Sequence, residues 1–166
     1  MSNDVETLFR KLTLGVYVIG VSHEGSRDAF TAACVMQTSY TPLMLALSIG
    51  PDHAAYPLLR DGGSFTVNVL DERQTALARH FGTRSGRDED KLNGLAWRQG
   101  LGGDPILDEA LAYFDCVLTA ITAAGDHQLV VGRVVDGGVV DPDGIPLAYS
   151  DTGDMDGSSA LYPESF

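Results

Sequence analysis

The sequence is poor in basic residues and has no long apolar run. Only 11 lysine and arginine residues stand against 23 acidic residues, so the formal net charge is −12. A field of this sign repels phosphate backbones and anionic headgroups, and we expect neither a nucleic-acid partner nor a membrane partner. No apolar run approaches the roughly 18 residues that cross a bilayer, and the acidic N-terminus is unlike a secretory signal. These absences predict a soluble, cytoplasmic protein.

Cysteine and histidine are also scarce. The two cysteines, Cys34 and Cys116, lie in separate apolar stretches without close-spaced partners, which predicts buried thiols that a reducing cytosol keeps free. None of the four histidines stands in a known pattern of metal ligands. We therefore expect neither a disulfide framework nor a bound metal.

Three common catalytic motifs are missing. The sequence has no G-x-x-x-x-G-K-[ST] phosphate loop, and Gly100, Gly102 and Gly103 lack the strand-to-helix context of a dinucleotide fingerprint. There is no G-x-S-x-G elbow that would indicate a serine hydrolase. If a nucleotide binds, it does so without a Rossmann fold.

The residues that are present predict one mainly β domain. Hydrophobic residues make up 44% of the 166 residues, enough for a packed core. Segments rich in β-branched or alternating apolar residues predict strands at 16–21, 30–39, 43–49, 64–70, 113–122 and 128–135. The last two would form a hairpin. Short strands at this spacing, with a few helices inserted, favour a β-barrel over a doubly wound sheet.

The sequence predicts helices in three places. Apolar residues recur every three or four positions over 3–12, where Asn3 and Glu6 form a capping-box pattern. A short helix is predicted at 54–60, and a better defined one starts at Asp71 and Gln74 and stops at Gly82. Residues 83–103 are polar and glycine-rich, which predicts a long excursion anchored by Leu92 and Trp97.

Basic residues gather in one window of the sequence. Five of them lie between Arg79 and Arg98 against three acidic residues. A local excess of positive charge in an acidic protein suits an anionic ligand, but a solvated loop with alternating charges explains it equally well. Both interpretations stay open at this point.

Six segments in order resemble the flavin reductase-like family of small FMN-binding split β-barrels. They are 9–19, 30–49, 63–70, 77–81, Lys91-Leu92, and 125–134 beginning with Gly-Asp-His. The resemblance implies a mainly β split barrel with a few helices over 1–150. It leaves 151–166 as a C-terminal extension that packs on the barrel or on the partner subunit.

The resemblance also implies a flavin, FMN with FAD as the alternative, near the interface of a homodimer. The residues expected along it are Thr31, Ala32, Ala33, Cys34, Val35, Met36, Gln37, Thr38, Ser48 and Ile49. Small side chains at the start of this run would let a flat ring approach the backbone. The same alternation also fits an ordinary half-buried strand.

Two further residues are carried over from the family. Lys91 matches a basic residue near the flavin and lies in the basic window, so we expect it to bind the phosphate. His127 matches a position where an imidazole lies near the nicotinamide or flavin, and it is the catalytic candidate. Its simpler interpretation is a histidine at the tip of a turn.

The function implied is that of an NAD(P)H:flavin oxidoreductase, in which hydride passes from NADH or NADPH to the flavin, with a separate oxygenase as partner. A flavin-binding electron-transfer module without its own nicotinamide site is the alternative, and a non-catalytic dimeric module is a third. His127 favours the first function. Met36 and Gln37, which depart from the serine-rich pattern common in the family, and the C-terminal extension leave the second open.

Overall fold

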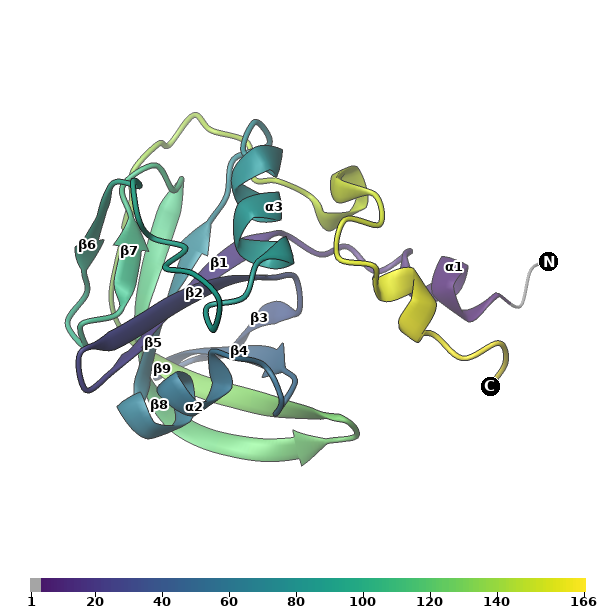
Figure 1. Ribbon diagram of the computed structural model, residues 1–166, viewed down its shortest axis with the longest axis horizontal. Helices are drawn as coiled ribbons and strands as arrows, with labels where there is room; N and C mark the ends of the chain where they lie inside the picture. Colours follow the sequence, from purple (N-terminus) through teal and green to yellow (C-terminus); the bar gives the residue numbers. More distant parts are fainter. Residues whose placement is uncertain (1–3) are drawn as a thin grey trace.

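The computed structural model describes residues 4–166, which form a mainly β fold with three short α-helices (Figure 1). The expected fold class is confirmed. The strands are β1 (Tyr17–His23), β2 (Ser26–Ala32), β3 (Val35–Tyr40), β4 (Leu43–Ile49), β5 (Ser64–Val69), β6 (Trp97–Gln99), β7 (Pro105–Leu107), β8 (Ala112–Ala124) and β9 (His127–Val139). Seven of them form one sheet in the order β2-β1-β5-β8-β9-β4-β3, and β6 pairs with β7. Every pairing is antiparallel.

The large sheet curls round an inner core. Phe30 of β2 and Leu47 of β4, near opposite ends of the strand order, lie in one buried cluster with Phe65 and Val130. Strands that far apart in the order can share a cluster only if the sheet bends back on itself. The curvature therefore brings β2 and the end of β4 together, and the site described below lies there.

The strand β1 is buried on both faces. Ile19 and Val21 face the inner core, whereas Val18 packs against Phe81 of helix α3 (Thr75–Thr83) in a second cluster. Alternation of side chains along a strand explains this division. Helix α2 (Tyr56–Gly62) contributes Leu59 to the inner core, and Figure 1 shows α2 and α3 on opposite sides of β1 and β2.

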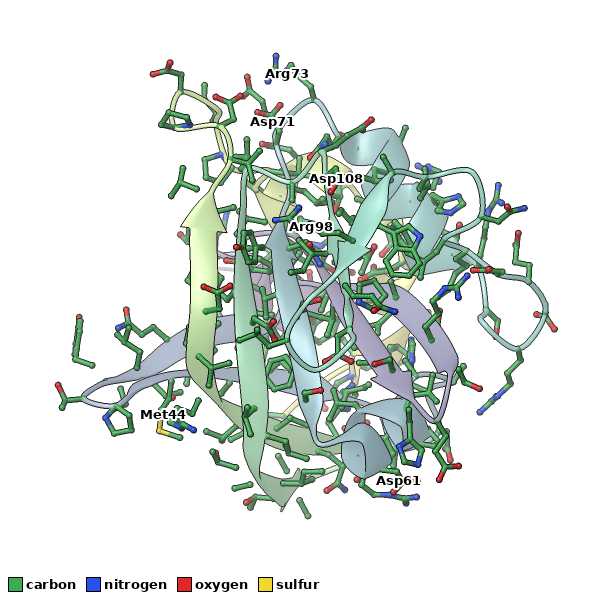
Figure 2. The ribbon with its side chains drawn as sticks, turned by 90° about the vertical axis from the view of Figure 1, so that its left-hand side faces the viewer. Met44, Asp61, Asp71, Arg73, Arg98 and Asp108 are labelled. Atoms are coloured by element: carbon green, nitrogen blue, oxygen red, sulfur yellow. The ribbon has the colours of Figure 1, made fainter. Side chains whose placement is uncertain are left out.

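Arg98 and several buried hydrogen bonds, such as that from the Leu107 N–H to Oδ1 of Asn68 at 2.8 Å, hold the β6–β7 ribbon against the barrel. Arg98 of β6 pairs with Asp108 at 3.0 Å, and its guanidinium lies 4.8 Å from the centre of the Tyr113 ring. Figure 2 shows Arg98 and Asp108 lying together in front of the sheet. The predicted excursion 83–103 thus contains a short strand, although Leu92 is the buried anchor that was expected.

The two ends of the described chain form a projecting arm. It consists of α1 (Val5–Phe9) and residues 149–166, which include the 3₁₀ turns η1 (Tyr149–Thr152) and η2 (Ser158–Leu161). Figure 1 shows these segments side by side beyond the barrel. The rings of Phe9 and Tyr162 lie 5.5 Å apart. Asp4 caps α1 by accepting a hydrogen bond from the Thr7 N–H, while Asn3 lies outside the described residues.

The single strand predicted for 30–39 is wrong. The chain turns at Ala33 and Cys34, where the Val35 N–H donates to the Ala33 carbonyl at 3.0 Å and the Ser48 N–H donates to the Cys34 carbonyl at 3.1 Å. A three-residue turn of this kind needs no glycine or proline, so the sequence carries no signal for it. The turn also leaves Cys34 exposed, against the expectation of a buried thiol, whereas Cys116 is buried as expected.

Other expectations hold with shifted limits. The predicted hairpin is present as β8 and β9, which pair over most of their 13 residues each. The helix expected from Asp71 begins at Thr75, and the Gln74 side chain accepts a hydrogen bond from the Asp71 N–H at 2.8 Å. Among residues 4–166, no helix is both long and apolar enough to span a bilayer.

Candidate functional site

A cavity of about 380 Å³ lies between β2, the end of β4 and the arm. We call it the main cavity. Seven of the residues predicted from the sequence line it: Thr31, Ala32, Ala33, Cys34, Ser48, Ile49 and His127. They come from three places in the sequence, and the curled sheet and the β8–β9 hairpin bring them together. The arm completes the lining with Tyr149, Asp156, Ser158, Leu161 and Tyr162.

The other predicted strand residues lie elsewhere. Val35, Met36 and Gln37 line a separate, apolar cavity of about 400 Å³ on the β3–β4 face. Thr38 lines neither cavity. The turn at Ala33 and Cys34 divides the predicted flavin-binding residues 31–38 into two groups. The two groups are continuous in sequence but lie on different surfaces of the protein.

Lys91 does not line the main cavity. Its side chain is only 1% exposed, and its ammonium nitrogen lies 3.1 Å from Oδ1 of Asp28, a carboxylate that is 5% exposed. The charge of Lys91 is therefore compensated inside the protein. This geometry corrects the expectation that Lys91 faces a phosphate and favours a structural role.

His53 lines the main cavity and was missed from the sequence. The Ala55 N–H donates to its Nδ1 at 3.2 Å, which places the ring proton on Nε2, and the ring packs 4.6 Å from that of Phe30. Burial, and next the positive charge of Lys91, lower the pKa of His53. The imidazole is thus a neutral hydrogen-bond donor near neutral pH. Its only sequence signal is its place four residues after the end of β4.

Arg87 was also missed as an individual residue, although it belongs to the basic window. Its Nη2 donates to the Asp52 carbonyl at 2.9 Å, which holds the guanidinium beside His53, and its charge contributes to the lowered pKa of that histidine. Unlike Lys91, Arg87 is exposed and forms no ion pair with any residue from 4 to 166. Its charge therefore remains available to an anionic ligand beside His53.

His127 begins β9 at the tip of the long hairpin. Its Nδ1 lies 2.8 Å from Oδ1 of Asp126, and its side chain is 46% exposed. The hydrogen bond to the imidazole lowers the pKa of Asp126, so the carboxylate stays charged and keeps the Nδ1 proton directed at itself. Nε2 is left for a ligand in the cavity.

The arm supplies the acidic end of the main cavity. The Tyr149 hydroxyl donates to Oδ2 of Asp156 at 3.0 Å, and the Ser158 N–H donates to Oδ1 at 3.1 Å. Partial desolvation by the surrounding side chains, and next the charge of Asp156, raise the pKa of the Cys34 thiol, which favours its uncharged form. No group of three or more potential metal ligands occurs among residues 4–166.

Different polar groups therefore lie along the β2 wall of the main cavity. His53 packs against Phe30, with Arg87 close to it but outside the lining, whereas Asp156 acts on Cys34, and small or apolar side chains make up much of the remaining lining. A flat, largely apolar ring with an anionic tail suits this lining, with the tail on the His53 side. Thr31 can only accept from such a ligand, because its hydroxyl already donates to the Ala78 carbonyl at 2.6 Å.

Comparison with known proteins gives matches over most of the chain. A family model described as "Flavin reductase like domain" matches residues 9–158. A flavin reductase of Pseudomonas putida is 30% identical over 145 residues, which cover 84% of each chain. Diflavin flavoprotein A 1 of Synechocystis sp. is 28% identical over 150 residues, 90% of this chain and 26% of that protein.

One solved structure, nitrilotriacetate monooxygenase component B of Mycobacterium thermoresistibile, is 29% identical with a TM-score of 0.78. The match covers 89% of this chain and 83% of that one. The chain spans about a quarter of the length of the diflavin flavoproteins that it matches. Since the family model covers the barrel, the hairpin and the arm as far as Ser158, this chain belongs to the flavin reductase-like family, and its mainly β fold is the split barrel expected from the sequence.

Proposed function

We propose that this protein is an NAD(P)H:flavin oxidoreductase that holds a flavin in the main cavity. The observation that carries the proposal is the mixed lining of the cavity, which has the neutral His53 donor with Arg87 nearby on the Phe30 side and Asp156 on the Cys34 side. FMN suits this lining, with its phosphate toward His53 and Arg87 and its ring against Ala32, Ala33 and Ile49. When bound, the flavin would supply the redox chemistry by accepting a hydride from a reduced nicotinamide.

The residues of the chain would bind, orient and shield the reactants. The small side chains of Ala32 and Ala33 leave the backbone of β2 accessible to a flat ring, and the arm covers the opposite side with Tyr162 and Leu161. Holding both rings in contact and excluding water is the main contribution that a protein makes to such a transfer. We assign His127 the task of positioning the nicotinamide, because Asp126 fixes its ring and leaves Nε2 toward the cavity.

A second candidate function is an electron-transfer module that holds flavin but has no nicotinamide site of its own. The similarity to the diflavin flavoproteins supports it, because this chain corresponds to about a quarter of each of those longer proteins. In such a setting, electrons would arrive from another protein domain. The exposed position of His127 and its pairing with Asp126 favour the reductase.

We further propose a homodimer. Seven large apolar side chains that are more than half exposed lie on two surfaces, and such exposed patches are unusual for a monomer. On the arm they are Leu8, Leu12, Leu161 and Phe166, and on the β3–β4 face they are Met36, Tyr40 and Leu43. A second copy that covered the β3–β4 face would bury the apolar cavity lined by Met36 and Leu43.

The proposed setting of the protein is the cytoplasm, and the proposed consumer of its reduced flavin is a separate oxygenase. Both cysteines are free, as expected where thiols are kept reduced. The similarity to a protein named as a monooxygenase component supports the oxygenase partner.

An anaerobic absorbance titration tests the proposal. The purified protein is mixed with FMN, bound flavin is detected by its spectral shift, and NADH or NADPH is then added. Rapid bleaching by either nucleotide is the expected result and identifies the donor. Bound flavin that stays oxidised with both nucleotides would support the electron-transfer module, and the absence of any bound flavin would refute both functions.

A further inference from the structure

The arm brings a single carboxylate to the main cavity. Asp156 lies between η1 and η2 and lines the cavity together with Tyr149 and Ser158 of the same arm. Among the described residues that line the cavity, no other is acidic, and none is a lysine or an arginine. The lining thus contains one negative charge, and the proposed function gives this charge no task.

Hydrogen bonds hold the Asp156 carboxylate in place. The Tyr149 hydroxyl donates to Oδ2 at 3.0 Å, and the Ser158 N–H donates to Oδ1 at 3.1 Å. Tyr149 is fixed in turn, because its N–H donates to the Leu14 carbonyl at 2.8 Å and its hydroxyl lies 2.8 Å from Oγ of Ser158. These contacts restrict the carboxylate to one position beside the cavity.

No cation compensates the charge of Asp156. Within residues 4–166 this carboxylate forms no ion pair, and both of its donors are neutral groups. Asp154, two residues earlier on the same arm, is different, because Arg10 pairs with it at 3.4 Å. An unpaired carboxylate beside a partly enclosed cavity acts on any charge that forms inside the cavity.

The charge of Asp156 lies on the ring side of the proposed flavin position. It contributes, after desolvation, to the raised pKa of the Cys34 thiol, so it acts on that part of the wall. Cys34 directly follows Ala33, against which the flavin ring is placed, whereas the phosphate is placed toward His53. A change in the charge of the ring would therefore occur close to Asp156.

Hydride transfer produces such a change. The hydride leaves the nicotinamide with both electrons of its C–H bond and forms an N–H bond at flavin N5. The nicotinamide ring becomes a cation, and the flavin ring gains one negative charge, while the phosphate keeps its charge. A neighbouring carboxylate repels the reduced ring and has little effect on the neutral oxidised ring.

We propose that Asp156 is a specificity-determining residue whose charge makes the main cavity bind reduced flavin more weakly than oxidised flavin. Tyr149 and Ser158 are its positioning residues. The inference rests on the proposed function and deepens it, because it makes the reduced flavin a product that leaves the protein. A neutral residue at this position would favour retention of the reduced flavin, which suits an electron-transfer module.

The experiment compares oxidised and reduced FMN on the full chain. Both dissociation constants are measured by anaerobic equilibrium dialysis, with the reduced FMN prepared photochemically. The perturbing variant is Asp156→Asn, which removes the charge at nearly constant shape, and Asp156→Glu retains the charge. The matched control is Asp151→Asn, which removes a charge from an exposed residue of η1 that does not line the main cavity.

We expect Asp156→Asn to bind reduced FMN about tenfold more tightly than the wild type, with the affinity for oxidised FMN changed less than about twofold. A tenfold change of this kind raises the midpoint potential of the bound flavin by about 30 mV for a two-electron couple. Added salt should narrow the difference between the two forms in the wild type and have little effect on it in Asp156→Asn. Asp156→Glu and the control should keep the wild-type preference.

The inference alone is overturned if the wild type binds FMN and Asp156→Asn has the same ratio of the two dissociation constants. It is also overturned if Asp156→Asn weakens both forms equally, because Asp156 would then hold the flavin whatever its redox state. A wild-type protein that does not bind oxidised FMN would overturn the proposed function, and this inference with it.

Discussion

Replacing Lys91 with methionine should destabilise the protein and leave its flavin affinity nearly unchanged. The Lys91 side chain is 1% exposed, and its charge compensates the carboxylate of Asp28, whose side chain is 5% exposed. Methionine fills similar space but leaves Asp28 buried without its cation, and the Oδ2 oxygen already has no donor among the described residues. The substitution therefore tests the structural role that the geometry assigns to Lys91.

The size of the effect follows from burial. Removing one partner of a buried ion pair costs about 3–5 kcal/mol. The lower end of this range applies, because Oδ1 of Asp28 keeps the Ala29 N–H at 2.7 Å. A domain of this length loses about 2–4 °C of Tm per kcal/mol, so Lys91→Met should lower Tm by roughly 6–12 °C.

The assay combines thermal unfolding with FMN titration. The double variant Asp28→Asn with Lys91→Met removes both charges and should recover about 2 kcal/mol relative to Lys91→Met alone. The reasoning is refuted if Lys91→Met unfolds within about 2 °C of the wild type and binds FMN more than about tenfold more weakly. That pattern would restore the interpretation in which Lys91 binds the phosphate.

Three further outcomes are expected. His53→Gln should reduce the loss of stability at acid pH. The pKa of His53 lies below 6.5 in the folded protein, so the unfolded chain binds the proton first and the wild type loses stability as pH falls below about 6.5. Equal losses of the free energy of unfolding from about pH 7.5 to about pH 5.5 in both proteins, measured by urea unfolding, would contradict this. His127→Ala should reduce NAD(P)H oxidation about a hundredfold and change the Kd for FMN less than about threefold, and the reverse pattern in stopped-flow and quenching data would remove His127 from the donor side. In the native protein a thiol reagent should modify exposed Cys34 and spare Cys116, because burial raises the pKa of the Cys116 thiol to about 12. Bound FMN should slow the modification of Cys34, and an unchanged rate would place the flavin elsewhere.

The strands were predictable because their patterns are local. The β8–β9 hairpin carries alternating apolar residues on both sides of Gly125 and Asp126, and the sheet forms there with two residues in the turn. The turn at Ala33 and Cys34 was not predictable, because it depends on a hydrogen bond from Ser48 in another strand. The halves of the predicted flavin-binding run consequently lie on different surfaces.

The site was predictable only in part, for a similar reason. The residues from Thr31 to Cys34 were identified because they share one segment with a family pattern, and they do line the main cavity. His53 and Arg87 become relevant only when the sheet curls and the 84–91 segment folds over Asp28. Lys91 shows the converse error: a basic residue in a basic window was expected to meet a ligand, but its partner is a buried acid from β2.

The ladder between β4 and β9 links the two sides of the site through hydrogen-bond register. Ser48 pairs with Leu129 and Ile49 pairs with Gln128, so His127, the residue before Gln128, is positioned by the same register that positions the β4 wall of the main cavity. Inserting one residue within 128–133 would turn every later side chain of β9 to the opposite face. Inserting one at Gly125 or Asp126 would leave the ladder intact. The hairpin turn is therefore the position at which the cavity lining around His127 can change in length without any rebuilding of the barrel.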